Sequence, residues 1–347
     1  MTAVGVTLCC PHCRADLDDH GSLLHCTGCQ HDFPVVCGIP DLRVFPDPYI
    51  EPEADRAKGR ALAARFDDFS FAELVAFYYS ITPAVPLHHA RRFTASVLTA
   101  PARSAASLTE WEAQVVPTNQ GTSASLLDVG CGTAPLLLAA HRRFGLLVGV
   151  DVAFRWLILA KKRLAEAGVN AVLLCASAEA LPLRDGLFDR VVADSVLEVV
   201  RDQVATLAEC RRVLHPGSAL FVTTPNRYSL GPDPHVGLLA GGLLPPSWIA
   251  AYARRQGAVP PHRRLLSAHR LRLLLEGAGF PRPRVLVPDI PAEQRRRLAW
   301  PLRALVDLYQ VVKRVPVGRS LLRWIGPLLH AVAQKPLDTQ TAGRQGR

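Results

Sequence analysis

The sequence predicts a doubly wound α/β fold, and one stretch carries most of that prediction. Apolar residues lead into Asp128, Gly130 and Gly132 follow at once, and a helix-forming run precedes a second apolar strand that ends on Asp151. The order strand, glycine turn, helix, strand is the opening unit of a doubly wound sheet. We therefore expect a mostly parallel sheet with helices on both faces.

The glycine turn also predicts a ligand site. Glycine has no Cβ, so the backbone can approach a ligand closely, and the helix that begins there points free N–H groups at it. Asp151 follows the second strand and is placed to accept hydrogen bonds from both hydroxyls of a ribose. A dinucleotide fingerprint needs a third glycine where this chain has Pro135, which disfavours NAD.

This stretch resembles the class I S-adenosylmethionine-dependent methyltransferases. The resemblance lies in an acidic residue two places before G-C-G-T and in the aspartate that closes the next strand. It implies that the glycine turn faces the methionine part of the cofactor and that Asp151 holds its ribose. Ala134 stands where the family usually has a third glycine, and it is small enough to leave the inference standing.

Further motifs follow in the order of the family. SAEALPLRDG resembles the adenine-binding stretch, with Ser177 for the usual aspartate, and RRVLHPGSALFVTTPN resembles the motif before and within the fifth strand. Val199 stands where the family often has histidine. A mechanism that needs a histidine at this position is therefore excluded. The resemblance implies a seven-stranded Rossmann-like sheet, over residues 124–336, with an antiparallel finish. It implies cofactor contacts from Asp128, Gly130, Cys131, Gly132, Asp151, Val152, Ser177, Ala178, Glu179, Asp194, Ser195 and Val196.

Residues 1–45 predict a small zinc ribbon. Cys10 and Cys13 form one C-x-x-C and Cys26 and Cys29 a second, and two such knuckles complete a tetrahedral site for a structural zinc ion. A redox or disulfide role for either pair is the alternative. The segment after the second knuckle resembles the zinc ribbons that serve as activating partners of tRNA and protein methyltransferases.

Residues 46–123 predict a linker and a helical lid. Prolines among acidic residues indicate a linker over residues 43–60, helical spacing covers residues 61–98, and residues 99–123 read as a loop. The resemblance implies that the helical segment covers the cofactor. The pairs Tyr78-Tyr79 and His88-His89 either line the site or belong to the core, and the core is the better prediction.

Residues 226–267 predict an apolar cap over the mouth of the site. Between His235 and Ala253 nothing is formally charged at neutral pH apart from that histidine. Its glycines and Pro245-Pro246 argue against a spanning helix. The candidates for a base, or for orienting the methyl acceptor, are His235, Tyr228 and Asn226.

The C-terminal part is strongly basic. The net charge is +10, and residues 251–330 hold sixteen Lys/Arg against four Asp/Glu. A basic amphipathic region over residues 292–324 predicts contact with phosphate, anionic lipid head groups or an acidic partner, or else a solvated face. A polar tail, 337–347, should be disordered. Nine cysteines and no secretory signal suggest a cytoplasmic protein, with possible peripheral membrane contact and no transmembrane segment.

Three functions follow as hypotheses. The first is methyl transfer from S-adenosylmethionine to a small or lipid-like acceptor at oxygen or carbon, motivated by the cap, the basic region and a resemblance to quinone-biosynthesis methyltransferases. The second is RNA methylation, with the ribbon and the basic surface holding phosphate. The third is a non-catalytic adaptor in which the ribbon recruits a partner.

Overall fold

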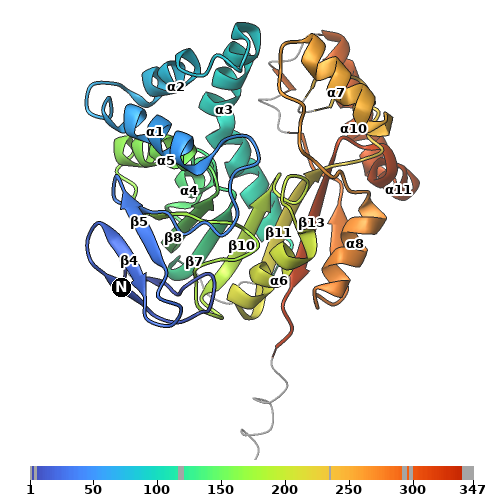
Figure 1. Cartoon of the computed structure of the whole chain (residues 1–347). Coiled ribbons are helices and arrows are strands. Elements are labelled where there is room, and N and C mark those ends of the chain that lie inside the picture. Colours follow the sequence, from blue (N-terminus) through green and yellow to red (C-terminus); the bar gives the residue numbers. More distant parts are fainter. Residues whose placement is uncertain are drawn as a thin grey trace, which may run out of the picture.

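A seven-stranded mixed sheet forms the centre of the molecule, in the order β12-β13-β11-β10-β7-β8-β9 (Figure 1). The computed structural model describes residues 2–3, 6–115, 121–233, 236–290, 295–296 and 300–337. The five adjacent strands β11, β10, β7, β8 and β9 run parallel to one another. Strand β13 is antiparallel to both of its neighbours, β11 and β12. This confirms the predicted doubly wound sheet and its antiparallel finish. The strands are β7 (Gly121–Val129), β8 (Phe144–Asp151), β9 (Val172–Cys175), β10 (Phe188–Asp194), β11 (Leu214–Pro225), β12 (Arg284–Leu286) and β13 (Leu328–Gln334).

Both faces of the sheet are covered, because successive strand residues point to opposite sides. On β7 the buried neighbours Leu126 and Leu127 belong to two different hydrophobic clusters, one on each face. Other strands, helices and residues of the N-terminal segment supply the rest of both clusters. The helices α4 (Pro135–Ala140), α5 (Phe154–Glu166) and α6 (Gln203–Val213) directly follow β7, β8 and β10, and α8 (Ala268–Gly277) precedes β12.

The N-terminal ribbon packs against the edge strand β9. Its four-stranded antiparallel sheet consists of β3 (Leu17–Asp19), β4 (Leu23–Cys26), β5 (Asp32–Val36) and β6 (Ile39–Pro40), and a short hairpin of β1 (Thr2–Ala3) and β2 (Val6–Thr7) precedes it. The N–H of Leu42 donates to the carbonyl oxygen of Cys175 at 2.7 Å, and Arg14 forms a 2.7 Å ion pair with Glu209 on α6. The ribbon therefore covers an edge that would otherwise present unpaired backbone groups.

Helices occupy much of the segment that the sequence analysis assigned to linker and loop. They are α1 (Pro52–Ala63), α2 (Phe71–Ser80) and α3 (Leu87–Glu112). The predicted linker, 43–60, is wrong from Pro52 onward, and the predicted loop, 99–123, is helical to Glu112 and strand from Gly121. Residues 116–120 lie outside the described residues. Leu108 and Trp111 on α3 are fully buried, so packing overrides the Ser/Thr/Ala/Pro-rich local sequence.

The remaining C-terminal elements flank the sheet on the side away from the ribbon (Figure 1). They are the 3₁₀ turn η1 (Gly241–Leu243) and the helices α7 (Pro246–Arg255), α10 (Trp300–Arg314) and α11 (Pro316–Ile325). The N–H of His262 donates to Tyr49 Oη at 2.9 Å, so the predicted cap region reaches the segment that follows the ribbon. Among the described helices, none combines the length and the apolar character that a bilayer crossing needs. The predicted disordered tail lies outside the described residues from residue 338 onward.

Candidate functional site

A cavity of about 420 Å³ lies at the carboxyl ends of the parallel strands. In doubly wound sheets this edge is where ligands bind. Nine of the twelve predicted cofactor residues line it, namely Gly130, Gly132, Asp151, Val152, Ser177, Ala178, Glu179, Ser195 and Val196. The other three, Asp128, Cys131 and Asp194, are not among its lining residues. The structure thus brings most of the predicted site together.

Asp151 is held in one orientation on the cavity wall. The backbone N–H of Gly132 donates to its Oδ2 at 2.7 Å, and the N–H of Ala153 donates to its Oδ1 at 2.8 Å. Burial raises the pKa of Asp151, and these two donors act in the opposite direction. Each carboxylate oxygen keeps further acceptor capacity. The group can therefore accept hydrogen bonds from a pair of neighbouring hydroxyls, such as those of a ribose.

The turn after β7 needs residues without a bulky side chain. Gly130 has φ of +72°, and a Cβ there would lie 2.4 Å from Cγ2 of Val196. Gly132 has φ of +51°, and a Cβ on it would meet no atom within 4 Å, so its side faces open space. Ala134 also adopts a left-handed conformation, with φ of +55°. Glycine adopts this conformation without strain, which explains why the methyltransferases that this stretch resembles have glycine there. For alanine the conformation is unfavourable by roughly 1–2 kcal/mol.

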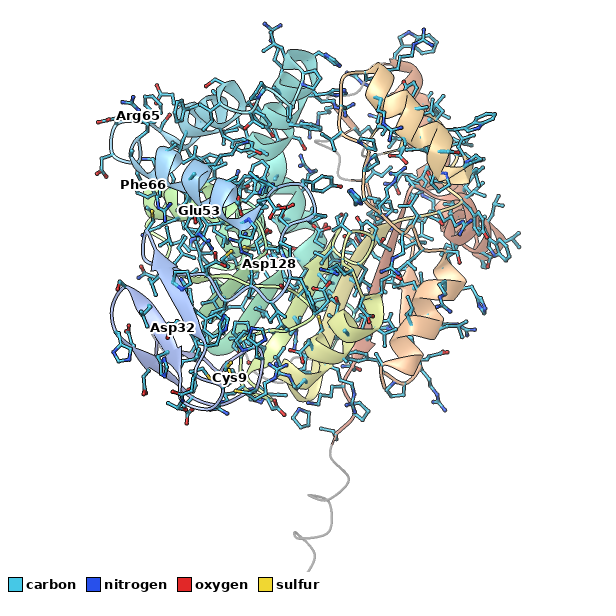
Figure 2. The ribbon with its side chains drawn as sticks, in the orientation of Figure 1. Cys9, Asp32, Glu53, Arg65, Phe66 and Asp128 are labelled. Atoms are coloured by element: carbon cyan, nitrogen blue, oxygen red, sulfur yellow. The ribbon has the colours of Figure 1, made fainter. Side chains whose placement is uncertain are left out.

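Acidic groups gather beneath the turn. Asp128 lies in the interior of the molecule on β7 (Figure 2), and only 3% of it is exposed. Burial raises the pKa of Asp128 well above its ordinary value, and the charges of Asp194 and Asp151 raise it further. Asp194 accepts hydrogen bonds from the hydroxyls of Thr223 and Ser195. Of these three aspartates only Asp151 lines the cavity, and its carboxylate would stabilise a cationic ligand group there.

Residues 45–49, predicted to be part of a linker, form one wall of the cavity. Ser177 Oγ accepts the N–H of Phe45 at 2.9 Å and donates to its carbonyl oxygen at 3.0 Å. Arg43, just before this wall, forms ion pairs with Asp41 at 2.6 Å and with Asp55 on α1 at 2.8 Å. The chain that leaves the ribbon is therefore fixed across the mouth of the cavity. Proline-rich sequence gave no sign of this docking.

A second cavity of about 500 Å³ adjoins the first and shares Tyr49, Arg155 and Trp156 with it. Its lining is mainly aromatic and aliphatic and includes residues of α2 and α3, residues 82–86 between these helices, and residues 256–261. Tyr78 and His89 are both buried and both line this cavity, so the two alternatives left open by the sequence are not exclusive. Tyr79 and His88 are not among its lining residues.

His89 has an unusual environment within this second cavity. Only 7% of the residue is exposed, and its Nε2 has no hydrogen-bond partner among the described residues. Burial lowers the pKa of His89, and the nearby charges of His88 and Arg92 lower it further. A hydrogen bond with the side chain of Gln256 acts in the opposite direction, and the net lowering of the pKa favours the neutral imidazole.

The three predicted catalytic residues are placed differently. Asn226 is 1% exposed, and its Nδ2 donates to the carbonyl oxygens of Trp324 at 2.9 Å and Gly326 at 3.0 Å. Its side chain thus holds the C-terminal end of α11 and lines neither of the two cavities. Tyr228 lines a separate cavity beside α11. His235 lies outside the described residues, although its neighbour Val236 lines the second cavity.

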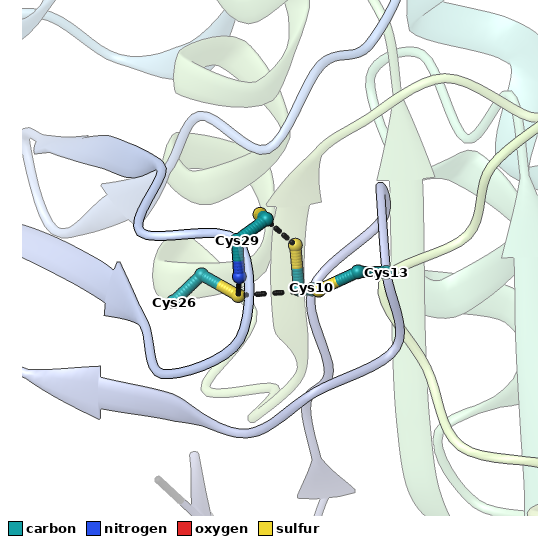
Figure 3. Close-up of side chains that lie close together, drawn as sticks. All are labelled: Cys10, Cys13, Cys26 and Cys29. Carbon is teal, nitrogen blue, oxygen red and sulfur yellow. Dashed lines mark hydrogen bonds between the residues drawn. The ribbon is translucent and has the colours of Figure 1, made fainter.

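The four predicted zinc ligands converge in the ribbon (Figure 3). All four sulfur atoms of Cys10, Cys13, Cys26 and Cys29 lie within 4.8 Å of one another, with 3.6 Å between Cys10 and Cys29 and 3.4 Å between Cys13 and Cys26. Four thiolates at about 2.3 Å from a tetrahedral zinc ion are separated by about 3.8 Å. The arrangement fits a zinc ion with no open coordination position.

Comparison with known proteins agrees with the geometry of the site. Residues 127–222 match the family model described as a methyltransferase domain. The ubiquinone biosynthesis O-methyltransferase of Parvibaculum lavamentivorans is 34% identical over 101 residues, which are 29% of this chain and 40% of that protein. The enzyme of the same name from Saccharophagus degradans is 35% identical over 103 residues, 29% of this chain and 44% of that protein. The chain thus spans less than half the length of these two relatives.

Among solved structures, the chain is similar to geranyl diphosphate C-methyltransferase from Streptomyces coelicolor A3(2), with a TM-score of 0.45 and 15% identity. That similarity covers 67% of this chain and 79% of the other.

Proposed function

We propose that this protein transfers a methyl group from S-adenosylmethionine to a small, apolar acceptor at oxygen or carbon. The observation that carries the proposal is Asp151, which is fixed by two backbone N–H groups on the wall of the cavity beside the glycine turn. The match of residues 127–222 to a methyltransferase domain supports it. The names of the relatives support oxygen as the atom methylated.

The second cavity supports an apolar acceptor. Aromatic and aliphatic side chains dominate its wall, and it adjoins the cofactor cavity through shared residues. An apolar or aromatic molecule of moderate size would lose its contact with water there. An RNA acceptor would need a wall that pairs with phosphate. We therefore favour a small or lipid-like acceptor over RNA.

In such a reaction the main task of the protein is to align the nucleophile of the acceptor with the methyl group and the sulfur of the cofactor. The bound sulfonium cofactor supplies an activated methyl group, which a nucleophile on the acceptor takes by direct displacement. For a hydroxyl acceptor we propose that His89 Nε2 takes the hydroxyl proton as the oxygen–methyl bond forms. The neutral state of the buried imidazole suits it for this role. His235 stays a second candidate for the base because its neighbour Val236 lines the same cavity.

We also propose that the cysteine cluster holds a structural zinc ion. The ribbon continues into residues 45–49, which line the proposed cofactor cavity. A domain of this size needs its metal to fold. Metal analysis of the purified protein should find one zinc ion per chain, and Cys26→Ser should lose it. Cys37→Ser, at a cysteine outside the cluster, is the matched control and should keep the metal.

Turnover with labelled cofactor tests the function. The protein should transfer labelled methyl to hydroxylated aromatic or quinol-like compounds, and His89→Gln should reduce kcat by at least about tenfold on hydroxyl acceptors. Folding of the variant is checked by its melting temperature. Labelling of RNA but of none of the apolar acceptors would contradict the proposed acceptor class. A calorimetric titration with S-adenosylmethionine that shows no heat of binding would favour the adaptor hypothesis.

A further inference from the structure

The outer faces of α10 and α11 carry two apolar stripes that face solvent. On α10 the exposed residues are spaced at three or four positions, and on α11 they continue with the same spacing, so each set lies along one side of its helix. Each of these side chains belongs to a residue that is more than half exposed: Leu305, Leu308 and Val311 on α10, Val315 between the two helices, and Val317, Leu321 and Trp324 on α11.

The inner faces of the same helices already account for their packing. Val306 and Leu322 are both buried at 8% exposure. Tyr309 Oη donates to the carbonyl oxygen of Pro288 at 2.7 Å, and Lys313 forms a 2.6 Å ion pair with Asp289. The helices are thus anchored to the body of the protein by one side. Folding of the described chain leaves the outer stripes in water, and an apolar surface of this kind indicates a binding partner.

A basic cavity of about 870 Å³ opens beside the stripes, between α8, β12 and α11. Its wall includes Arg272, Arg284, Arg323 and His269, and no aspartate or glutamate. Within the described part of the chain, Arg272 has one carboxylate near it, Glu276 at 3.9 Å, and no ion pair joins Arg323 to an acidic residue. Such a wall attracts a phosphate group.

The cavity and the apolar stripe share helix α11. Trp324 belongs to the stripe and also lines the cavity, and Arg323 precedes it. An anionic group in the cavity would therefore lie directly beside an apolar surface. A phospholipid at the surface of a bilayer offers this combination, with the phosphate next to the acyl chains, and tryptophan is enriched at this interface.

We propose that this surface, formed by the α10–α11 stripes and the arginine-lined cavity, docks onto an anionic phospholipid bilayer. The apolar side chains enter the boundary between head groups and acyl chains, and the arginines bind lipid phosphate. The inference does not depend on the methyl-transfer activity, because it uses none of the residues of the cofactor cavity.

Two other occupants fit less well. A second copy of this chain would bring together two faces from a region with sixteen Lys/Arg and four Asp/Glu, and these charges repel. The phosphates of an RNA would pair with the arginines. The leucine and valine side chains would remain in water, because these side chains offer no aromatic surface on which bases stack. An anionic bilayer offers phosphate to the arginines and acyl chains to the apolar stripes.

Vesicle sedimentation with the full chain tests the proposal. The protein should bind vesicles of phosphatidylcholine with phosphatidylglycerol and should bind pure phosphatidylcholine at least about tenfold more weakly. The double variant Val317→Glu/Leu321→Glu should bind the mixed vesicles at least about tenfold more weakly. Val204→Glu, at an exposed valine on α6 outside this surface, is the matched control and should bind like the wild type. Arg272→Gln/Arg323→Gln should lose the preference for the anionic lipid.

Several outcomes would overturn the proposal. One is equal binding of the mixed vesicles by the wild type and the α11 double variant, and another is no binding at low salt. A dimer in solution that Val317→Glu/Leu321→Glu dissociates, together with absent vesicle binding, would assign the face to a second copy. RNA binding that is lost in Arg272→Gln/Arg323→Gln, without vesicle binding, would assign it to nucleic acid. Because all variants are on the surface, unchanged melting temperatures should accompany the expected result.

Discussion

Ser177 and Phe45 form two hydrogen bonds through one side-chain hydroxyl, at 2.9 Å from the backbone N–H of Phe45 and 3.0 Å to its carbonyl oxygen. Ser177 follows the edge strand of the sheet, and Phe45 belongs to the chain that leaves the ribbon. The pair therefore connects the two parts of the molecule at the wall of the cofactor cavity. Integrity of the ribbon and shape of the cavity should depend on each other.

Arg43 should contribute strongly to stability. Its side chain is 4% exposed and pairs with Asp41 and Asp55, which are buried as well. Arg43→Ala removes a positively charged partner from these two buried carboxylates, so we expect the free energy of unfolding to fall by about 3–5 kcal/mol. Arg60→Ala, which removes an exposed ion pair with Glu53, should cost less than about 1 kcal/mol. Denaturant unfolding of both variants measures this, and equal costs would contradict the assignment.

Asp151 should control cofactor affinity. Asp151→Ala removes a charged acceptor for the ribose hydroxyls, worth about 1.5–3 kcal/mol, so the Kd for S-adenosylmethionine should rise by about tenfold or more. Calorimetric titration measures the change. Glu276→Gln, at an exposed carboxylate on α8, serves as the control and should leave Kd unchanged. An unaltered affinity in Asp151→Ala would remove the ribose assignment.

Glu198 should make stability depend on pH. Burial raises the pKa of Glu198 from 4.5 to about 7, and its Oε2 accepts the hydroxyl of Thr224 at 3.0 Å. The folded protein keeps this proton to about pH 7, whereas the unfolded chain releases it near its ordinary pKa. The contribution of Glu198 to the free energy of unfolding therefore falls as pH rises between these two values.

The matching variant is Glu198→Gln, which keeps the shape of the side chain without the charge. It should equal the wild type in stability at pH 4 and exceed it by about 3 kcal/mol at pH 8. Thermal unfolding across this range measures the difference. A variant that is less stable than the wild type at pH 8 would show that the carboxylate is ionised and usefully paired in the folded protein.

Asn226 should act on stability more than on chemistry. Asn226→Ala leaves the carbonyl oxygens of Arg323, Trp324 and Gly326 without their donor, which should cost about 1–3 kcal/mol. We expect a lower melting temperature with kcat largely retained at a temperature where the variant is folded. Unchanged stability with lost turnover would instead support the catalytic role that the sequence suggested.

The fold could be predicted because its signals are local. The strand that contains Asp128, the glycine turn and the strand that ends at Asp151 are each predicted from residues that are adjacent in the sequence. The cavity at the carboxyl ends of the parallel strands could be predicted for the same reason, since these ends meet at one edge of a sheet.

What the sequence did not reveal depends on distant contacts. The prolines of residues 45–49 indicate an extended chain but not its docking on Ser177. Residues 99–112 lack a helical signal, and burial of Leu108 and Trp111 against the sheet stabilises their helix. Asn226 follows a strand as a catalytic residue can, yet its partners lie about a hundred positions away, on α11 and just after it.

A crystal structure with S-adenosylhomocysteine tests the central claim most directly. The account predicts the ligand in the cavity between Gly130 and Ser195, with both ribose hydroxyls within hydrogen-bond distance of the Asp151 carboxylate. A ligand bound elsewhere, or a ribose that does not contact Asp151, would contradict it.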